Sequence, residues 1–275
     1  MNMLKRHRIR IDSGVDMARL TFAAVAAVTL SALWTAPVRA DQPKPMAVKT
    51  CSAPADLVMV EGPLNHFAKA LRAGQPVTIV ALGSSSTWGA GATSRANGYP
   101  ARLEAELRSE WPGVKLEVVN AGVNGDLAAD MLGRIDRDVV ARKPQLVIWQ
   151  TGVNDAMNGV PVERFRDEVR QGIARIRGAG ADVMLLDPQY APRVERLPLT
   201  KSYVDAMQAI GAETGVALVQ RFRVMKHLID SAQFTVATLF NADQLHLNDS
   251  AYACLGHLMA LSLDRAVEHQ SGPIR

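Results

Sequence analysis

Five short runs of apolar residues alternate with longer amphipathic segments along most of the chain. The runs cover residues 77–82, 115–120, 145–150, 182–187 and 216–220. Because they are almost continuously apolar, they are typical of strands that are buried on both faces of a parallel sheet. The amphipathic segments, which we expect to be helices, cover about 98–110, 126–142, 161–178, 200–214 and 249–266.

The alternation of strands and helices predicts the architecture. Each strand–helix–strand unit forms a right-handed crossover, so the helices pack on both faces of one sheet. We therefore predict an α/β fold, a three-layer α/β/α sandwich with a central, mostly parallel five-stranded sheet. In such sheets the functional site lies beyond the carboxyl ends of the strands. The loops that directly follow the five apolar runs are where we expect the chemistry.

The first forty residues follow a different pattern. A basic stretch, KRHRIR, precedes an apolar run over 20–34, and the sequence APVRA ends in the small residue Ala40. This order is typical of a secretory signal peptide. A membrane span needs about 20 apolar residues, and this run is shorter. We predict a signal peptide over 1–40, with an uncleaved membrane anchor as the alternative. Either Met1 or Met17 could be the translation start.

Cleavage after Ala40 changes the charge balance. The removed segment contains six of the 31 basic and two of the 27 acidic residues, which leaves 25 of each. A nucleic-acid-binding protein would have a basic domain or stripe, so the neutral mature chain excludes that class. We expect a periplasmic or secreted protein without a stable membrane span. It would have an extended leader over 41–58 and a single domain over 59–275. The sequence leaves the oligomeric state open.

Two cysteines lie near the two ends of the mature chain. Cys51 and Cys254 could form a disulfide in an oxidising compartment, or both could be buried free thiols. The mature chain of about 235 residues is long enough to form a large core without a metal or a dense disulfide framework. The histidines are scattered and no His-Glu-x-x-His motif occurs, so we expect no metal site and no cofactor.

Four polar clusters occupy loops where this architecture places its site. They are GSSST after the first apolar run, NAGVNGD after the second, TGVND after the third, and DQLHLN before the last amphipathic segment. The first cluster lacks the Gly-Lys-Ser/Thr ending of a phosphate-binding P-loop and the spaced glycines of a dinucleotide site. Each cluster does contain a group that is useful for acyl transfer, so we favour that chemistry.

A serine hydroxyl is a poor nucleophile at neutral pH and needs an adjacent general base. His246 could supply the base, and Asp243 could accept the other ring N–H of that histidine and fix its tautomer. A tetrahedral intermediate also needs hydrogen-bond donors for its oxyanion, and a backbone N–H beside a glycine or an asparagine amide is suitable. From the residues alone, Ser84, Ser85 and Ser86 are all candidates for the nucleophile.

Taken together, the four clusters resemble the sequence blocks of the SGNH (also called GDSL) hydrolases over about residues 77–266. The triplet Gly83-Ser84-Ser85 is similar to the Gly-Asp-Ser block of that family. The resemblance implies that Ser85 is the nucleophile and that Ser84 replaces the usual aspartate, which is not the acid of the triad. It also implies the flavodoxin-like SGNH hydrolase fold.

The other three blocks supply the remaining site residues that the resemblance implies. NAGVNGD points to Gly125, Gly-Val-Asn-Asp points to Asn154, and Asp-Gln-Leu-His points to Asp243 and His246. The catalytic triad would be Ser85, His246 and Asp243. The oxyanion hole would consist of the Ser85 and Gly125 backbone N–H groups and the Asn154 side chain.

The resemblance implies an exported serine esterase that cleaves a small-molecule or glycan ester, similar to the periplasmic thioesterase/lysophospholipase-like branch of the family. The alternatives are a carbohydrate O-acetylesterase, an O-acyltransferase, or a non-catalytic binding module with the same fold. Trp88, Gln189 and Tyr190 lie in the loops after the first and fourth apolar runs, so they are candidate substrate contacts. The sequence does not specify the acyl chain or the alcohol.

Overall fold

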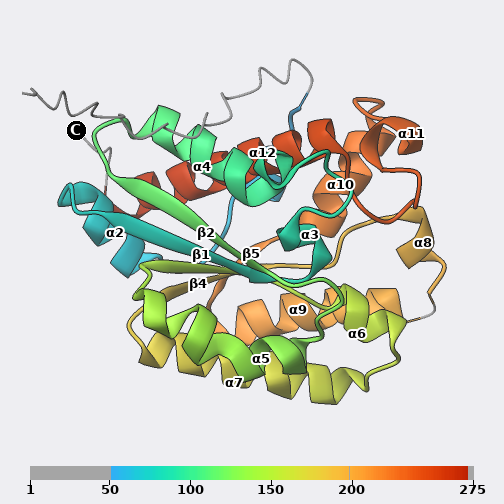
Figure 1. Cartoon of the computed structure of the whole chain (residues 1–275), viewed down its shortest axis with the longest axis horizontal. Coiled ribbons are helices and arrows are strands. Elements are labelled where there is room, and N and C mark those ends of the chain that lie inside the picture. Colours follow the sequence, from blue (N-terminus) through green and yellow to red (C-terminus); the bar gives the residue numbers. More distant parts are fainter. Residues whose placement is uncertain (1–50, 198, 272–275) are drawn as a thin grey trace, which may run out of the picture. The chain divides into compact units, whose positions relative to one another are not determined.

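A single parallel sheet of five strands organises the protein (Figure 1). The structure is a computed structural model that describes residues 51–197 and 199–271. Its strands are β1 (Val77–Gly83), β2 (Leu116–Gly122), β3 (Leu146–Gln150), β4 (Asp182–Leu186) and β5 (Ala217–Val219). They lie in the order β2-β1-β3-β4-β5, and every pair is parallel. This confirms the predicted α/β/α fold and its flavodoxin-like order.

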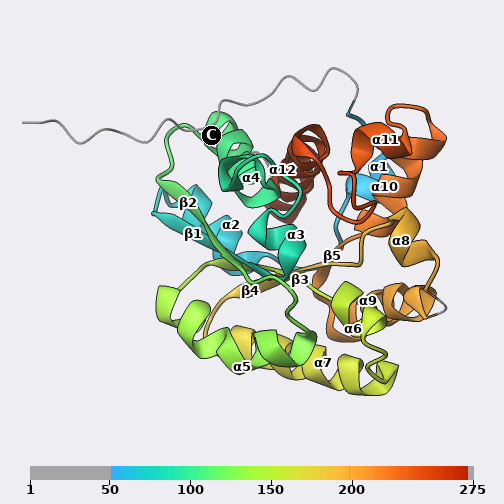
Figure 2. The ribbon, with the colours of Figure 1, turned by 45° about the vertical axis from the view of Figure 1, so that its right-hand side comes forward.

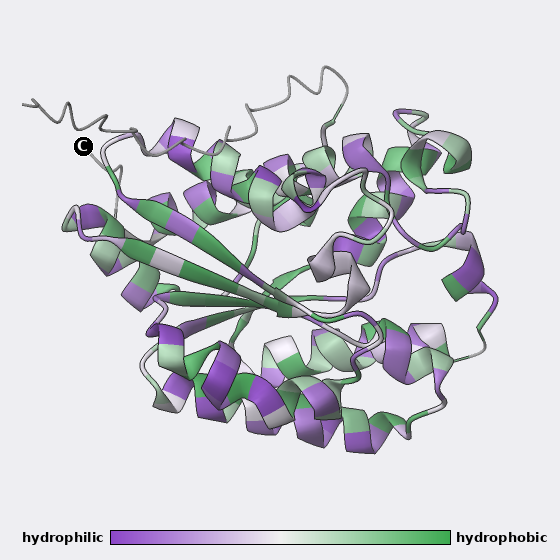
Figure 3. Ribbon diagram, viewed as in Figure 1, coloured by the Kyte–Doolittle hydropathy of each residue, from purple (hydrophilic) through white to green (hydrophobic). Residues whose placement is uncertain are grey.

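Each strand contributes apolar side chains to two separate cores. Successive side chains of a strand point to opposite faces, so Ile79 and Ile148 join one hydrophobic cluster while Val80 and Trp149 join the other. Because both faces are covered by helices, neither face can be polar, which explains the continuous apolar runs. Figure 3 shows the hydrophobic strands in the middle layer and hydrophilic residues on the outer sides of the helices.

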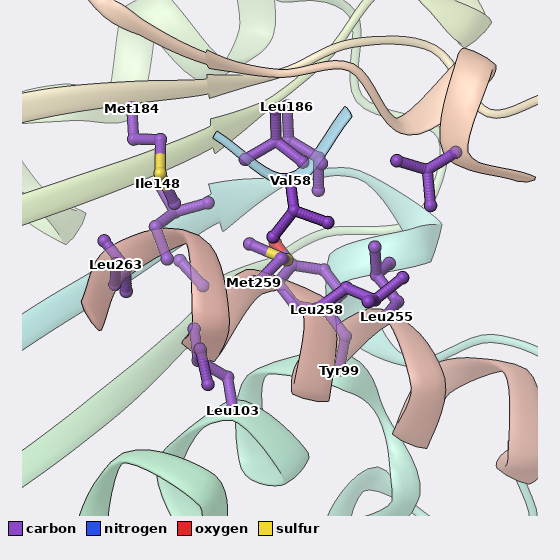
Figure 4. Close-up of a cluster of buried hydrophobic side chains, with 14 of the residues drawn as sticks. Val58, Tyr99, Leu103, Ile148, Met184, Leu186, Leu255, Leu258, Met259 and Leu263 are labelled. Atoms are coloured by element: carbon purple, nitrogen blue, oxygen red, sulfur yellow. The ribbon is translucent and has the colours of Figure 1, made fainter. Parts of the chain in front are cut away.

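Two groups of helices cover the sheet (Figures 1 and 2). One face carries α5 (Ala128–Asp138), α7 (Val162–Gly178) and α9 (Thr200–Thr214). The other face carries α2 (Asn65–Arg72), α4 (Tyr99–Glu110), α10 (Arg221–Asp230) and α12 (Asp249–Ser271). Figure 4 shows part of the core between the sheet and this second group of helices. Side chains of α4 and α12, including Leu103 and Leu263, gather there beneath Ile148.

All five expected helices are present, with two differences. The last one, α12, continues to residue 271 instead of ending near 266. The segment expected to be helical over 126–142 forms α5 only from residue 128 to 138, and a 3-10 turn, η2 (Val140–Arg142), follows it. Helices α2 and α10 were not among the five expected segments. Several shorter helices were not expected either. They are α1 (Ala55–Val58), α3 (Ser85–Trp88), η1 (Arg95–Asn97), α6 (Val153–Met157), α8 (Pro192–Glu195) and α11 (Val236–Leu239). Segments of one turn are too short to show a helical hydrophobic period.

The amino-terminal part of the described chain is attached to the domain. Cys51 forms a disulfide with Cys254 of α12, which selects between the two alternatives left open by the sequence. The expectation of an extended leader up to residue 58 is wrong for its last four residues, because they form α1 and bury Leu57 and Val58 in the core. The predicted signal peptide lies outside the described residues.

Candidate active site

The three consecutive serines lie where β1 ends and α3 begins. Ser84 is buried, and both its backbone N–H and its hydroxyl donate to the Gln150 side-chain oxygen, at 3.0 and 3.2 Å. Thr87 donates to the same oxygen at 3.0 Å. Gln150 is itself fully buried at the end of β3. These bonds attach the short helix α3 to the centre of the sheet.

Only one of the three serines contacts a histidine. The Ser85 hydroxyl oxygen lies 2.8 Å from Nε2 of His246. The Ser84 hydroxyl is occupied by Gln150, and the buried Ser86 hydroxyl lies 3.4 Å from the side-chain oxygen of Gln189. The geometry therefore distinguishes the serines, because Ser85 alone has a general base within hydrogen-bonding reach.

Asp243 and His246 form a compact pair in the loop before α12. Nδ1 of His246 lies 2.5 Å from one carboxylate oxygen of Asp243. The other oxygen accepts the backbone N–H groups of Leu245 and His246, both at 3.0 Å. Burial by itself raises the pKa of Asp243, but the hydrogen bonds from His246 and Leu245 outweigh it and hold the pKa below its ordinary value. The carboxylate is therefore charged at neutral pH.

Close packing fixes the position of this loop. Phe240 and Leu247 form an antiparallel bridge across it, and the backbone N–H of Asn241 donates to the carbonyl of His246 at 2.8 Å. Gly91 packs against the same loop, since a Cβ on Gly91 would lie 2.8 Å from Cβ of His246. The position of His246 is therefore held by the bridge within its own loop and by the segment that follows α3, which packs against that loop.

The three predicted oxyanion donors come from the segments that directly follow β1, β2 and β3. Asn154 lies in α6, and its amide nitrogen donates to the backbone carbonyl of Asp126 at 2.8 Å, which leaves the second N–H of this amide for another acceptor. Within residues 51–197 and 199–271, the backbone N–H groups of Ser85 and Gly125 have no hydrogen-bond acceptor. Gly125 has a φ of +83°, which favours glycine there.

The three candidate substrate contacts have other partners in the structure. Trp88 is half-buried, and the guanidinium of Arg95 lies 5.4 Å from its ring centre. Gln189 is buried, and it bonds Ser86 and, weakly, the carbonyl of Leu245. It therefore links α3 to the histidine loop.

Tyr190 donates to Glu195 at 3.1 Å and packs edge-on against Phe222 of α10. Contact of Trp88, Gln189 or Tyr190 with substrate stays a prediction.

Two positions at this edge of the sheet were not identified from the sequence. One is Gln150, whose polar side chain ends an otherwise apolar strand, which is a signal that could have drawn attention to it. The other is Arg134, which is almost completely buried on α5 and contacts the ends of β1 and β2. In the sequence, Arg134 is one of several charged residues in an amphipathic segment, so nothing there separates it from a surface arginine.

Comparison with known proteins identifies the family. Residues 50–269 match the model of the Non-GDSL lipase-like family. The chain belongs to this family. Because this match covers most of the chain and the relatives are SGNH-type esterases, the protein is an SGNH/GDSL-type hydrolase that acts on ester bonds. None of the helices in the described part of the chain has the length and apolar character of a membrane span.

Three similar proteins illustrate the relationship. Esterase TesA of Pseudomonas aeruginosa is 29% identical over 153 residues, which cover 53% of this chain and 70% of the relative. Thioesterase 1/protease 1/lysophospholipase L1 of Escherichia coli K12 is 27% identical over 206 residues, covering 73% and 89%. A crystal structure of TesA superposes with a TM-score of 0.59 at 25% identity, over 69% of this chain and 99% of that one.

Proposed function

We propose that the protein hydrolyses carboxylic esters or thioesters through an acyl-enzyme on Ser85. The observation that carries the proposal is the continuous chain of two hydrogen bonds from Ser85 through His246 to Asp243, at 2.8 and 2.5 Å. This is the geometry that an activated serine requires: a base on the hydroxyl, and a carboxylate that orients the base. The names of the relatives support the same bond type, an ester or a thioester.

The reaction follows from the positions of these atoms. The Ser85 hydroxyl oxygen attacks the carbonyl carbon of the ester while Nε2 of His246 takes the hydroxyl proton. The resulting imidazolium then donates this proton to the leaving alcohol or thiol, which departs as the tetrahedral intermediate collapses to the acyl-enzyme. A water molecule repeats the sequence, giving its proton to His246 and releasing the carboxylic acid and the free serine.

Asp243 has two functions in this mechanism. Its carboxylate accepts a hydrogen bond from the Nδ1–H group of His246, so the lone pair on Nε2 faces Ser85. Its negative charge also stabilises the imidazolium that forms when the proton moves. The two backbone N–H groups that bind Asp243 keep it ionised and fix its orientation.

The oxyanion would be stabilised by the Ser85 and Gly125 backbone N–H groups and by the Asn154 amide. The two backbone groups have no acceptor in the described part of the chain, and Asn154 retains one N–H beyond its bond to Asp126. The loss of one such donor typically lowers turnover about 100- to 1,000-fold. Two exposed apolar side chains are close in sequence to these donors: Val123 lies two residues before Gly125, and Met157 ends α6, three residues after Asn154. They support an apolar acyl group beside the donors.

We also propose that the protein is exported after removal of residues 1–40. The disulfide between Cys51 and Cys254 supports this, because disulfides persist mainly in oxidising compartments outside the cytoplasm. Amino-terminal sequencing of the protein from the periplasm or medium tests this proposal, with Asp41 as the expected first residue.

The first experiment is labelling with a fluorophosphonate probe, followed by mass spectrometry of the labelled peptide. Wild type and the Ser84→Ala, Ser85→Ala and Ser86→Ala variants form the matched set. We expect label on Ser85 in wild type and in both control variants, and none in Ser85→Ala. A folded wild-type protein that takes no label would refute the acyl-enzyme mechanism and favour a binding module.

A panel of p-nitrophenyl esters of increasing chain length, together with an acetylated oligosaccharide, then tests the substrate class. A higher kcat/KM for butyrate or octanoate than for acetate supports the apolar acyl site. Activity restricted to the acetylated sugar would instead identify a carbohydrate O-acetylesterase, and transfer to an added sugar alcohol would identify an acyltransferase.

A further inference from the structure

The buried Arg134 joins the three segments that carry the proposed oxyanion donors. It lies on α5, is 8% exposed, and uses all three of its guanidinium nitrogens. Two of its N–H groups donate to the backbone carbonyls of Gly83 and Ala121, at 2.9 and 2.8 Å. These carbonyls belong to the carboxyl ends of β1 and β2, so one side chain bridges the ends of two neighbouring strands.

The remaining bonds of Arg134 lead to the loop between β2 and α5. Its Nε donates to the carboxylate of Asp126 at 2.7 Å, and Asp126 directly follows Gly125. The backbone carbonyl of Asp126 accepts the hydrogen bond from Asn154. The guanidinium therefore holds Asp126, which is the sequence neighbour of Gly125 and the hydrogen-bond acceptor of Asn154.

The helix that carries Arg134 is itself attached to the third loop. The backbone N–H of Ala128, the first residue of α5, donates to the buried Asp155 carboxylate at 3.1 Å. Asp155 is the neighbour of Asn154 in the sequence. A fourth bond of Arg134, to Asp138 one turn along the helix at 2.9 Å, limits the rotation of the arginine. The start of α5 is thus fixed to the Asn154 segment through Asp155, and the Arg134 side chain is fixed to its own helix through Asp138.

We propose that Arg134 is a positioning residue that sets the relative places of the Ser85, Gly125 and Asn154 donors. This inference rests on the acyl-enzyme function proposed above. Arg134 bonds none of these three donor groups, so it acts through Gly83, Asp126 and the α5 helix.

An arginine suits this task because its planar fork presents donors in several fixed directions at once. A lysine ammonium at the same place could keep the ion pair with Asp126, but it could not also reach both strand carbonyls. Oxyanion stabilisation depends on donors that are in place before the charge develops. An error of about 1 Å in such a group can lower the rate about 100-fold. A residue that fixes three donors together therefore affects turnover without touching the substrate.

The test compares Arg134→Met, Arg134→Lys, Asn154→Ala and the double variant Arg134→Met/Asn154→Ala with wild type. Arg137→Met is the matched control, because Arg137 lies on the same helix and pairs with the same Asp138 but is 75% exposed and contacts neither loop. Each protein is checked by circular dichroism and thermal unfolding. The readouts are kcat and KM for one p-nitrophenyl ester, the pH profile of kcat/KM, and the affinity for an alkyl boronic acid, which forms a tetrahedral adduct with a serine.

We expect Arg134→Met to lower kcat about 100-fold and to weaken boronic acid binding in parallel, with little change in KM. The pH profile should keep its shape because Arg134 does not contact His246. In the double variant, the loss should be smaller than the product of the two single losses, since both changes disturb the same donors. Arg134→Lys should recover only part of the loss, and Arg137→Met should behave as wild type.

A folded Arg134→Met protein with wild-type kcat would overturn the proposal, as would a fully multiplicative double variant. If Arg134→Met does not fold, the comparison of Arg134→Lys with Asn154→Ala and their combination tests the same coupling. These outcomes are distinct from a failure of the acyl-enzyme function, which would appear as an inactive, unlabelled wild-type protein.

Discussion

Removal of the disulfide between Cys51 and Cys254 should lower the stability of the folded protein while leaving its chemistry intact. The bridge joins residues that are 203 positions apart, so it closes nearly the whole domain into one loop. In the chain-entropy model, a loop of this length gives about 5 kcal/mol of stabilisation at 25 °C through restriction of the unfolded chain. This is an upper value, because engineered and native bridges commonly contribute about 2–4 kcal/mol.

The variant to use is Cys51→Ala/Cys254→Ala, because both sulfurs are buried and alanine introduces no new polar group. Urea unfolding followed by fluorescence would give the free energy of unfolding of wild type, of wild type with reductant, and of the variant. We expect both bridge-free forms to lose at least 2 kcal/mol and to retain wild-type kcat after refolding. Equal stability of all three forms would refute the reasoning. It would mean that the bridge does not restrict the unfolded chain relative to the reduced form.

Two further predictions concern the histidine loop and the pH dependence of stability. Gly91→Ala would place a Cβ 2.5 Å from the carbonyl of Leu247 and 2.8 Å from Cβ of His246, so kcat should fall about 100-fold through displacement of the base. Gly89→Ala is the control, since Gly89 also has a positive φ but its nearest neighbour would be 3.5 Å away; an equal loss in both variants would attribute the effect to backbone strain alone. Burial raises the pKa of Asp187 to about 7, against the Phe222 N–H bond that lowers it. The folded state therefore binds more protons than the unfolded state between about pH 4 and 7, and stability falls as pH rises through this window, by at most about 1.4 kcal/mol per pH unit. Asp187→Asn should flatten this slope in urea titrations at several pH values, and an unchanged slope would contradict the assignment.

The sheet and the main helices could be predicted because their signals are local and repeated. A strand such as β3 is apolar at every position except its last, and a helix such as α7 repeats its apolar positions over 17 residues. One-turn helices such as α3 and α6 carry no such period. Their formation depends on contacts with distant residues, as when Gln150 of β3 binds Ser84 and Thr87.

The places of three of the four site loops could also be predicted, because these loops follow strands whose carboxyl ends lie at the same edge of the sheet. The individual residues were indicated by the resemblance to the SGNH sequence blocks. The choice among the serines could not be made from their own neighbourhood. The three serines are consecutive and identical. Ser85 is distinguished in the structure by its contact with His246, 161 residues away, while Ser84 and Ser86 bind Gln150 and Gln189.

The sequence by itself determined the fold class, the four loops that carry the chemistry and the residue types in them, because the hydrophobic pattern and the loop motifs are contained in short stretches of the chain. The tertiary structure decided which atoms meet: the pairing of Cys51 with Cys254, the bond between His246 and Ser85, and the bonds of Arg134 to the ends of β1 and β2 and to Asp126. These contacts depend on the sheet bringing distant segments together to within a few ångströms. A buried arginine and an exposed one have the same letter in the sequence, and only burial and partners separate them.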